Sequence, residues 1–423
     1  MNLDHLPVAI VGAGPVGLAA AAHLHRYGVD FVVLEAGERV GAAVRRWGHV
    51  RLFSPWAQNL DQASVRLLTE TAAWSAPPPA HIPKGDELLR DYLEPLASSP
   101  PLRSKINLGS RVRSITKLSA DRTSTEGRGA LPFELFVEGE GRSALLHARA
   151  VIDATGLLDR PKPIGANGLA IPGEAECSRL TTYGVPRASD LAAMGERVLV
   201  IGSGHSAMQS VVALSFASKG RRRSLNWAFR RASAECLLRI EGVDRFPARL
   251  ALQAKARSAI AAGSVRLHFN AVFERAERLP SGIELTWADG HRRSFDHVIV
   301  ATGYKPDHAM VSELQTAFDP IYEAPAGMRR VLDIARTACA AVPPHGEAEL
   351  RHPEPNFYVV GMRSFGRASS FLMRAGYEQV RTIAARIAGD DEAACPQPFA
   401  PLAEESLAEF LAENPDYLEE AFG

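Results

Sequence analysis

Two short stretches of the chain carry glycines at a spacing that suits the binding of a pyrophosphate. PVAIVGAGPVG (7–17) and RVLVIGSGHSA (197–207) are both apolar runs that end in a turn of the pattern G-x-G-x-x-G/A. The first glycine of such a turn allows a tight bend, the second leaves room for the phosphates, and the third allows close packing of helix on strand. The helix that follows offers unpaired N–H groups to the anion. The sequence therefore predicts two dinucleotide sites.

The first turn is followed by an acid at the distance expected for ribose binding. Residues 31–35, FVVLE, predict a second strand, and Glu35 ends it 18 residues after the last glycine of the turn. A carboxylate at this place can accept hydrogen bonds from both ribose hydroxyls, and it would repel a 2′-phosphate. Strand, turn, helix and acid together favour a dinucleotide site over an ordinary βα turn. The residues predicted to bind this first cofactor are Gly12, Gly14, Pro15, Gly17 and Glu35.

The second turn is followed by arginines in place of an acid. LNWAF (225–229) predicts a strand, and Arg230 and Arg231 follow it directly. Because a guanidinium binds phosphate oxygens in pairs, this turn favours a ribose 2′-phosphate, and so NADPH over NADH. The alternative is a solvated basic face shared with KGRRR (219–223). The residues predicted to bind this second cofactor are Gly202, Gly204, His205, Ser206, Arg230 and Arg231.

His205 has two readings. Its side chain could serve as an acid or base. It also stands at the predicted start of a helix, where the positive end of the helix dipole disfavours a charged imidazole.

The elements that must carry these turns are short, apolar and rich in β-branched residues. Such runs are typical of parallel strands that are buried on both faces. They are VAIV (8–11), AVIDATG (150–156), VLVI (198–201) and HVIVATG (297–303). Charged, alternating sections within each half predict small antiparallel meanders, at 111–118 with 133–150 and at 265–279 with 282–296. Helical patterns cover 17–28, 206–220 and 376–389. The chain thus contains one α/β pattern twice.

The composition excludes several other classes of protein. Lysine plus arginine and aspartate plus glutamate both number 48 in 423 residues, which gives no overall basicity for nucleic acid or a membrane surface. The N-terminus lacks a basic signal region, and the longest apolar stretch, 8–22, is shorter than the roughly 20 residues of a membrane span. The four cysteines are scattered without a C-x-x-C, so no metal site is expected. A cytoplasmic protein that binds neither membrane nor nucleic acid is predicted.

Further motifs, in this order along the chain, give a family resemblance. They are DATG (153–156), ATGYKPD (301–307), NFYVVG (356–361) and the helix opening at AGYEQ. With the two glycine turns, they resemble the flavoproteins with two dinucleotide-binding domains. These include class B flavin-containing monooxygenases, Baeyer–Villiger enzymes and thioredoxin reductases. The resemblance implies an α/β fold of two Rossmann-like domains that bind FAD and NADPH, with three-layer ββα character and small antiparallel meanders.

The resemblance also implies a domain order and further cofactor contacts. The first part of the FAD-binding domain is expected at 1–165, an inserted NADPH-binding domain at 166–303, and the rest of the FAD-binding domain with an acidic tail at 304–423. The backbone of Val112 would meet the adenine, and the amides of Gly376 and Tyr377, at a helix start, would face the flavin N1/O2 edge. By the same resemblance, the FAD edge would be lined by Thr155 and Gly156. The domain crossover would contain Thr302 and Gly303, and the ribityl chain would lie near Gly361 and Met362.

The departures from these families narrow the activity. Without a C-x-x-C, a disulfide cannot be reduced through a cysteine pair, and Met362 stands where disulfide reductases carry Asp. The monooxygenase fingerprint F-x-G-x-x-x-H is altered, with Ile171 and Cys177 at its ends, and Trp47 is displaced from a G-G-x-W segment. The leading hypothesis is an NADPH-dependent monooxygenase whose reduced flavin and O₂ form a C4a-(hydro)peroxide that oxygenates a small molecule.

Two other functions stay open. One is an NADPH dehydrogenase or reductase that passes electrons to a quinone, a metal or a carrier protein. The other is a nucleotide sensor that keeps FAD as a structural element. The oligomeric state stays open between a monomer and a homodimer.

Candidate residues for the flavin face follow the first turn. Trp47, Gln58 and Asn59 are the predicted catalytic residues, with Asn59 supplying an amide to the oxygenated flavin; Phe53, Ser54 and Trp56 belong to the same segment. The alternative is that the aromatic residues are ordinary core. Phe365, Arg367 and Arg374 could shape the pocket or bind an anionic substrate, and surface salt bridges are the alternative for both arginines.

Overall fold

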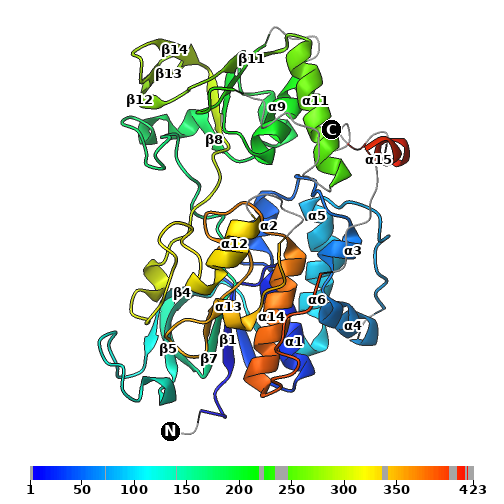
Figure 1. The fold of residues 1–423 in the computed structure, drawn as a ribbon, viewed down its shortest axis with the longest axis vertical. Coiled ribbons are helices and arrows are strands. Elements are labelled where there is room, and N and C mark those ends of the chain that lie inside the picture. The colour runs from blue at the N-terminus through cyan, green and yellow to red at the C-terminus, as the bar shows by residue number, and fades with distance from the viewer. Residues whose placement is uncertain are drawn as a thin grey trace. The chain divides into compact units, whose positions relative to one another are not determined.

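The chain forms two compact units, described by a computed structural model over residues 3–71, 73–139, 141–218, 223–233, 246–335, 342–399, 407–414 and 417. Unit 1 comprises Met1–Leu158 and Lys305–Leu402, and unit 2 comprises Asp159–Tyr304 and Ala403–Gly423 (Figure 1). From the sequence we expected the crossings after residues 165 and 303 and the tail within the FAD-binding domain. Residues 219–222 of the basic run, Cys236 and Cys339 lie outside the described residues.

Unit 1 is built on a parallel sheet whose strands lie in the order β16-β7-β1-β2-β3. A second, antiparallel sheet has the order β4-β5-β6. The strands of unit 1 are β1 (Val8–Val11), β2 (Phe31–Leu34), β3 (Ile106–Asn107), β4 (Arg111–Lys117), β5 (Phe133–Gly139), β6 (Arg142–Ala148), β7 (Ala150–Asp153) and β16 (Phe357–Val359). Its helices are α1 (Pro15–Arg26), α2 (Ala42–Arg46), α3 (Trp56–Asn59), α4 (Gln62–Thr71), α5 (Gly85–Leu88), α6 (Glu94–Ser98), α7 (Pro100–Arg103), α12 (Arg329–Ala335), α13 (Glu347–Leu350) and α14 (Met373–Ala388).

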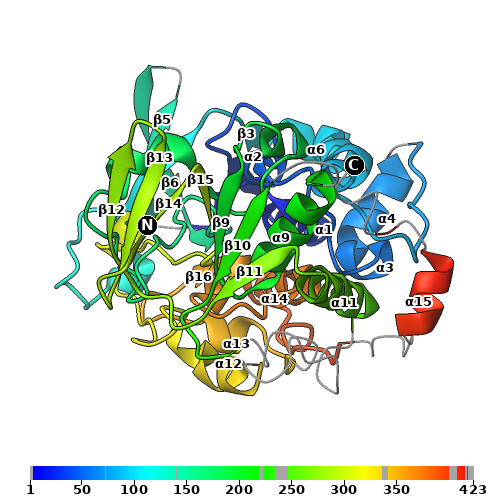
Figure 2. The same cartoon turned by 90° about the horizontal axis from the view of Figure 1, so that it is seen from above.

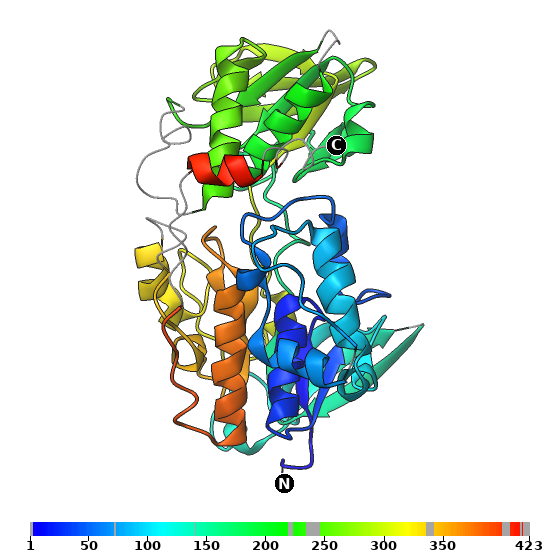
Figure 3. The same cartoon turned by 90° about the vertical axis from the view of Figure 1, so that its right-hand side faces the viewer.

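Strand β1 lies between two cores, which makes unit 1 a three-layer structure. Side chains alternate between the faces of a strand, so its residues divide between the two sides. Val8 and Ile10 belong to the core beneath α1 and α14, whereas Ala9 and Val11 belong to the core shared with the β4–β6 sheet. All four are buried, as expected of a parallel strand covered on both faces. Figure 3 shows α1 and α14, in dark blue and orange, running side by side.

Unit 2 repeats this plan, which is seen most clearly in Figure 2. Its parallel strands have the order β11-β10-β9-β15-β8, and a smaller antiparallel sheet has the order β12-β13-β14. The strands are β8 (Thr181–Tyr183), β9 (Arg197–Ile201), β10 (Ser224–Ala228), β11 (Val265–His268), β12 (Phe273–Leu279), β13 (Gly282–Trp287), β14 (Arg292–Phe295) and β15 (His297–Val300). The helices are α8 (Ala188–Leu191), α9 (His205–Ala217), α11 (Pro247–Ala261) and α15 (Leu407–Glu413), of which α15 packs on α11. The α/β fold class with two Rossmann-like halves is confirmed.

Two details differ from the sequence predictions. Residues 265–268 were expected in a meander, but β11 pairs in parallel with β10 at the sheet edge, where a half-exposed strand alternates in the same way. Helix α14 begins at Met373, three residues before the predicted start. None of the helices in the described part of the chain has both the length and the apolar character that a membrane crossing needs.

Candidate functional site

In unit 1, the glycine turn follows β1 and is covered on one side by the segment after β7. Gly12 has φ +103°, and a Cβ atom there would lie 2.9 Å from the carbonyl oxygen of Ala154. The N–H of Gly12 donates to the oxygen of Leu34 at 2.8 Å. A Cβ atom on Gly14, in contrast, would meet nothing within 4 Å. The turn is therefore closed at Gly12 and open at Gly14, where a phosphate has room.

The turn after β9 in unit 2 is built in the same way. Gly202 has φ +135°, and a Cβ atom there would lie 2.2 Å from the oxygen of Ala301. Its N–H donates to the oxygen of Ala228 at 3.2 Å, and a Cβ atom on Gly204 would meet nothing within 4 Å. Both units thus have an open phosphate turn at the carboxyl end of the central strand, where ligands bind in parallel α/β sheets.

The register of the strands shows which residue of unit 2 corresponds to Glu35. The last residues of β1 and β2 are paired, and so are the last residues of β9 and β10. Glu35 and Phe229 come next in the chain, so Phe229 occupies the position of the acid, and its side chain is 1% exposed. Arg230 and Arg231 lie one and two residues further on. The sequence analysis had instead matched Arg230 and Arg231 directly to the position of Glu35.

The loop after the third strand extends this correspondence. The N–H of Gly109 donates to the oxygen of Gly37 at 2.9 Å, and the N–H of Asn270 donates to the oxygen of Arg231 at 3.0 Å. Both donors have positive φ, +63° and +51°. Arg231 therefore corresponds to Gly37, and Arg230 to the residue before it. Both arginines belong to the corner of unit 2 that corresponds to the ribose corner of unit 1.

The carboxylate of Glu35 is held by backbone amides and is 8% exposed. Its Oε2 accepts from the N–H of Ala13 at 2.7 Å, and its Oε1 accepts from the N–H of Gly37 at 2.8 Å. The backbone oxygen of Glu35 accepts from the N–H of Ser110 at 2.8 Å, which places the start of β4, with Val112, next to this corner. Each carboxylate oxygen keeps a lone pair for a further donor.

The side chains of the second turn present positive charge from the arginines and none from the histidine. Arg230 is exposed, and its Nη1 donates to the oxygen of Ala166 at 3.3 Å. His205 is the first residue of α9, followed by Ser206. Burial and the neighbouring Arg249 lower the pKa of His205 to about 3, so the imidazole is neutral at pH 7. The position of His205 at the helix start is the one that the second reading gave it, whereas its lowered pKa comes from burial and Arg249.

Arg363, which the sequence did not single out, holds the segment after β7. Its Nε lies 3.1 Å from Oδ2 of Asp153, and Nη1 donates to Oγ1 of Thr155 at 3.0 Å. Nη2 bonds the backbone oxygen of Asp307. The Arg363 and Asp153 side chains are 7% and 0% exposed. The signal for it in the sequence is weak, since Arg363 stands four residues after the end of the apolar strand β16, in GMRSF.

The residues expected at the crossover into unit 1 bond within unit 2. Oγ1 of Thr302 donates to the oxygen of Lys162 at 2.6 Å, and the oxygen of Gly303 accepts from the N–H of Lys162 at 2.8 Å. In unit 1, Gly156 has φ +72°. The segment at Lys162 is therefore hydrogen-bonded to the segment at Thr302 and Gly303. The predicted contacts of these residues with FAD stay predictions.

Two glycines that are distant from α1 in the sequence, Gly361 and Gly376, lie against the start of this helix. A Cβ atom on Gly361 would lie 3.2 Å from Cγ2 of Val16, and one on Gly376 would lie 2.6 Å from the same atom. The structure thus brings both glycines next to the first phosphate turn, and Met362, after Gly361, is 36% exposed. Helix α14 begins at Met373, so Gly376 and Tyr377 are its fourth and fifth residues, and the N-cap oxygen of Leu372 accepts from the N–H of Ala375 at 2.9 Å. The contact of the Gly376 and Tyr377 amides with flavin stays a prediction.

The expected flavin-face residues differ in how far their polar groups are already satisfied. Asn59 is 1% exposed; its Oδ1 accepts from Oγ of Ser54 and its Nδ2 donates to the oxygen of Ser54, both at 2.7 Å. The backbone oxygen of Asn59 accepts from the hydroxyl of Tyr377 at 2.8 Å. Oε1 of Gln58 is buried and has no hydrogen-bond partner in the described structure. Trp47 packs against Gly85, where a Cβ atom would lie 2.8 Å from the indole ring.

The two arginines considered for an anionic substrate have local contacts. Nε of Arg367 lies 2.9 Å from Oε2 of Glu323. The guanidinium of Arg374 lies 5.1 Å from the ring centre of Phe399. Phe365 is fully buried. For Arg367, the geometry favours the salt-bridge alternative.

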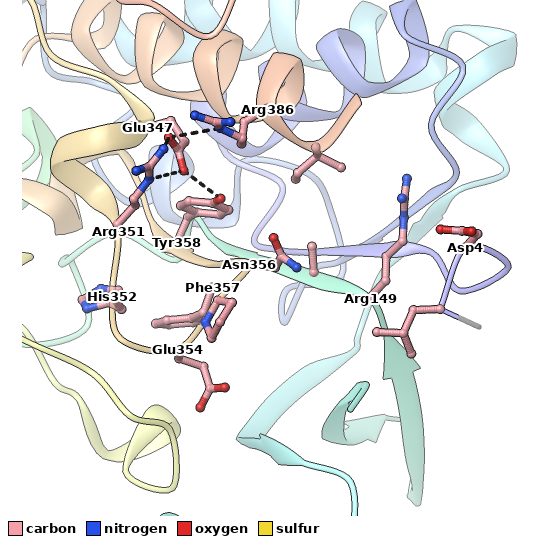
Figure 4. Close-up of a pocket in the computed structure, with 14 residues that line it drawn as sticks. Asp4, Arg149, Glu347, Arg351, His352, Glu354, Asn356, Phe357, Tyr358 and Arg386 are labelled. Atoms are coloured by element: carbon pink, nitrogen blue, oxygen red, sulfur yellow. Dashed lines mark hydrogen bonds and ion pairs between the residues drawn. The ribbon is translucent and has the colours of Figure 1, made fainter. Parts of the chain in front are cut away.

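A cavity of about 480 Å³ in unit 1 lies away from these turns (Figure 4). It is lined by the residues that precede and begin β7 and β16, so it lies at the amino edge of the sheet. Its central carboxylate, Glu347, accepts from the guanidinium of Arg351 at 2.6 and 2.8 Å and from the hydroxyl of Tyr358 at 3.1 Å. Nε of Arg386 lies 3.5 Å from the same group. Because both oxygens of Glu347 are already bonded or paired within the protein, we assign no cofactor to this cavity.

His352, in the wall of this cavity, gives unit 1 a predicted sensitivity to acid. It is 8% exposed, its Nδ1 accepts from the N–H of Ala317 at 3.1 Å, and burial lowers its pKa to about 4. An unfolded histidine has a pKa of about 6.5, so this contribution to stability is complete above pH 6.5 and is lost as the pH falls towards 4. Between pH 7 and 5 the loss should be about 2 kcal/mol.

The measurement is urea unfolding of the wild type and of His352→Gln at both pH values. The wild type should lose about 2 kcal/mol more than the variant over this interval, since every other titrating group is common to both. An equal loss in the two proteins would contradict a neutral, buried His352.

The fold and the two phosphate turns define a protein with two dinucleotide-binding units. The family model for pyridine nucleotide-disulphide oxidoreductases matches residues 9–323, which covers both turns. The chain therefore belongs to this family, and the family implies binding of FAD and NAD(P)H.

The similar proteins include both oxygenases and a reductase. A Baeyer–Villiger monooxygenase of Streptomyces coelicolor is 32% identical over 214 residues, which is 49% of this chain and 35% of that protein. The chain thus spans about a third of this relative. A bacillithiol disulfide reductase of Bacillus cereus has a TM-score of 0.67 at 19% identity, covering 91% of this chain and 99% of that one. An ornithine N-hydroxylase of Kutzneria sp. 744 has a TM-score of 0.58 at 15% identity, covering 92% and 99%.

Proposed function

We propose that the protein is an NADPH-dependent FAD monooxygenase that transfers one oxygen atom of O₂ to a small molecule. The observation that carries the proposal is the duplicated phosphate turn with unlike ribose corners. Glu35 stands at this corner in unit 1, whereas Arg230 and Arg231 follow the buried Phe229 in unit 2. A carboxylate suits the free ribose hydroxyls of FAD, and guanidinium groups suit the 2′-phosphate of NADPH.

The residues of unit 1 fit the ADP half of FAD. Gly14 leaves the space in front of the α1 N-terminus open, so that a pyrophosphate could reach the helix amides. Glu35 is oriented by two backbone amides and retains acceptor capacity for a ribose. FAD, when bound, supplies the two-electron chemistry that protein side chains lack.

The residues of unit 2 fit NADPH in the corresponding way. Gly204 leaves the same open space before α9. Arg230 is oriented by the carbonyl of Ala166, and the backbone of Arg231 by Asn270. His205 is neutral, and the exposed Arg230 and Arg231 supply positive charge at the ribose corner, which favours the nucleotide with a 2′-phosphate.

The contribution of the remaining side chains is to position the reactants and exclude water. We assign Gln58 to contact with substrate or flavin, because its buried Oε1 has no partner in the described structure. Asn59 shapes the loop that carries it, through its two bonds to Ser54. Two observations support O₂ as the electron acceptor. Part of the chain is similar in sequence to a Baeyer–Villiger monooxygenase, and the sequence contains no C-x-x-C.

An NADPH-dependent reductase is the second candidate, favoured by the structural similarity to a bacillithiol disulfide reductase. In that case electrons would pass to a quinone, a metal or a carrier protein. The two functions would share both cofactor sites, and they differ in the use of O₂.

The deciding experiment supplies O₂ or another acceptor to the NADPH-reduced protein. We expect anaerobic NADPH to bleach the flavin, air to restore it, and ¹⁸O from ¹⁸O₂ to appear in the product from methyl phenyl sulfide or cyclohexanone. NADPH oxidation that ignores O₂ and requires added quinone would replace the monooxygenase proposal by the reductase. A protein that binds no flavin would refute both.

Removing both arginines should weaken NADPH far more than NADH. Each lost charge-assisted hydrogen bond costs about 1.5–3 kcal/mol, which is roughly tenfold to hundredfold in affinity. We expect Arg230→Ala with Arg231→Ala to raise the Kd for NADPH at least tenfold, by calorimetry, and to leave the Kd for NADH within about twofold. Arg275→Ala with Arg278→Ala, which removes two exposed charges from β12, is the matched control. Equal losses for both nucleotides would remove the 2′-phosphate assignment.

A further inference from the structure

Three fully buried polar side chains surround the backbone of Gly361. Gln379, Ser364 and His345 are each 0% exposed. The N–H of Gly361 donates to Oε1 of Gln379 at 2.8 Å, and Oγ of Ser364 donates to the oxygen of Gly361 at 2.8 Å. Side chains therefore bond both backbone polar groups of this glycine, which is the first residue of a short 3₁₀ helix, Gly361–Phe365.

His345 determines which way the Gln379 amide faces. Nδ1 of His345 lies 2.8 Å from the carbonyl oxygen of Pro343, which can only accept, so Nδ1 carries the proton and Nε2 offers a lone pair. Nε2 of Gln379 donates to this lone pair at 3.0 Å and to Oγ of Ser364 at 2.8 Å. A rotated amide would place N–H groups against the N–H of Gly361. Burial also lowers the pKa of His345, which keeps the imidazole neutral.

Gly361 is held where a shift of its backbone would be felt at the first phosphate turn. Gly361 has φ +67° and packs against Val16. A Cβ atom added at Gly361 would lie only 3.2 Å from Cγ2 of Val16. Val16 is the second residue of α1, directly after the open Gly14-Pro15 step. Gly376 on α14 lies against the same side chain, and Gln379 is one turn further along α14.

We propose that Gln379, oriented by His345, is a positioning residue for the FAD site: it locks the Gly361 turn against Val16 at the first phosphate turn. This rests on the proposed function in so far as unit 1 binds FAD. The buried amide acts only through Gly361 and touches no reacting atom.

The test compares Gln379→Met with Thr382→Val in the purified holoprotein and after removal of its flavin. Thr382 is also 0% exposed on α14; its Oγ1 accepts from the N–H of Glu347 at 2.9 Å and donates to the backbone oxygen of Gln379 at 2.8 Å. In the described structure it has no bond to Gly361 or to the Gln379 amide side chain. The readouts are hydrogen–deuterium exchange of the peptide that contains Gly361, without cofactor, and the Kd for FAD by fluorescence titration. We expect Gln379→Met to speed exchange and raise the Kd at least about tenfold, and Thr382→Val to change neither by more than about threefold.

Gln379→Glu serves as the second variant, because its carboxylate still accepts from Gly361 and would pair with a protonated His345. It should restore slow exchange at Gly361. Equal exchange in the wild type and Gln379→Met, or equal losses in Gln379→Met and Thr382→Val, would overturn the inference. If the wild type bound no FAD, the proposed function would fail, while the exchange data would still decide whether Gln379 holds Gly361.

Discussion

Gly14→Ala should give a folded protein that binds FAD much more weakly, whereas Gly204→Ala should keep FAD but be reduced by NADPH only at higher NADPH concentrations. At both positions the backbone is extended, with φ −83° and −92°, so alanine introduces no strain. A Cβ atom would meet no protein atom within 4 Å at either place. The added methyl group would therefore occupy the space proposed for a pyrophosphate and nothing else.

The expected size of the effect follows from overpacking a close contact. Forcing an extra methyl group into such a contact costs about 1–3 kcal/mol, or roughly fivefold to hundredfold in affinity. The flavin content of the purified protein, the Kd for FAD and the anaerobic rate of reduction by NADPH report the two sites separately. Each variant is the control for the other, since both make the same change in equivalent turns.

Gly12 and Gly17 would not give this separation. A Cβ atom on Gly17 would lie 1.9 Å from the backbone oxygen of Gly12, so alanine there must move the helix or the strand. If Gly14→Ala retained full FAD, or if Gly204→Ala lost FAD and NADPH together, the assignment of one cofactor to each turn would be wrong.

The sequence was most informative where burial by itself determines the residue type. The strand VAIV at 8–11 is predicted and observed with the same bounds, because a parallel strand covered on both faces must be apolar throughout. The spacing of the glycines in each turn is also local and could be predicted, although the segment that closes on Gly12, at Ala154, is distant in the chain. Edge strands such as 265–268 carry a weaker signal, and there the prediction of a meander was wrong.

The sequence was least informative where two distant polar groups satisfy each other. Arg363 and Gln379 stand in unremarkable stretches, and their importance appears only when Asp153 and Gly361 are seen beside them. Asn59 illustrates the opposite case, because the sequence alone singled it out. Its contact with flavin stays a prediction: Ser54 bonds both polar atoms of the amide, and each of these atoms keeps one further hydrogen-bonding position.

The start of α14 was misplaced for a related reason. Gly376 looked like the end of a loop, since glycine is unfavourable inside a helix. The structure needs it within the helix, because a side chain there would collide with Val16. Packing between α1 and α14 thus outweighs the local preference.

Glu354→Gln should destabilise unit 1 by about 3–5 kcal/mol, because it leaves two buried cations without their anion. The side chains of Glu354, Arg128 and Lys117 are 0%, 2% and 1% exposed. Oε2 of Glu354 accepts from Nε of Arg128 at 2.7 Å, and Oε1 lies 3.9 Å from Nζ of Lys117. Urea unfolding at pH 7 measures the loss. Glu138→Gln, which breaks an exposed pair on the same antiparallel sheet, is the control and should cost less than about 1 kcal/mol.

The pH dependence of the stability lost in Glu354→Gln shows whether the loss comes from the buried charge of Lys117 or from the shape of the side chain alone. Burial lowers the pKa of Lys117 to about 8 even with Glu354 nearby, while an unfolded lysine titrates near 10.4. Without the carboxylate, the folded state favours neutral Lys117 still more, so stability should rise as the pH increases through the folded pKa. The difference between wild type and Glu354→Gln should therefore shrink from pH 7 to pH 9. A difference that stays constant would mean that the glutamate contributes shape and hydrogen bonds, and that its charge does not decide the stability of this cluster.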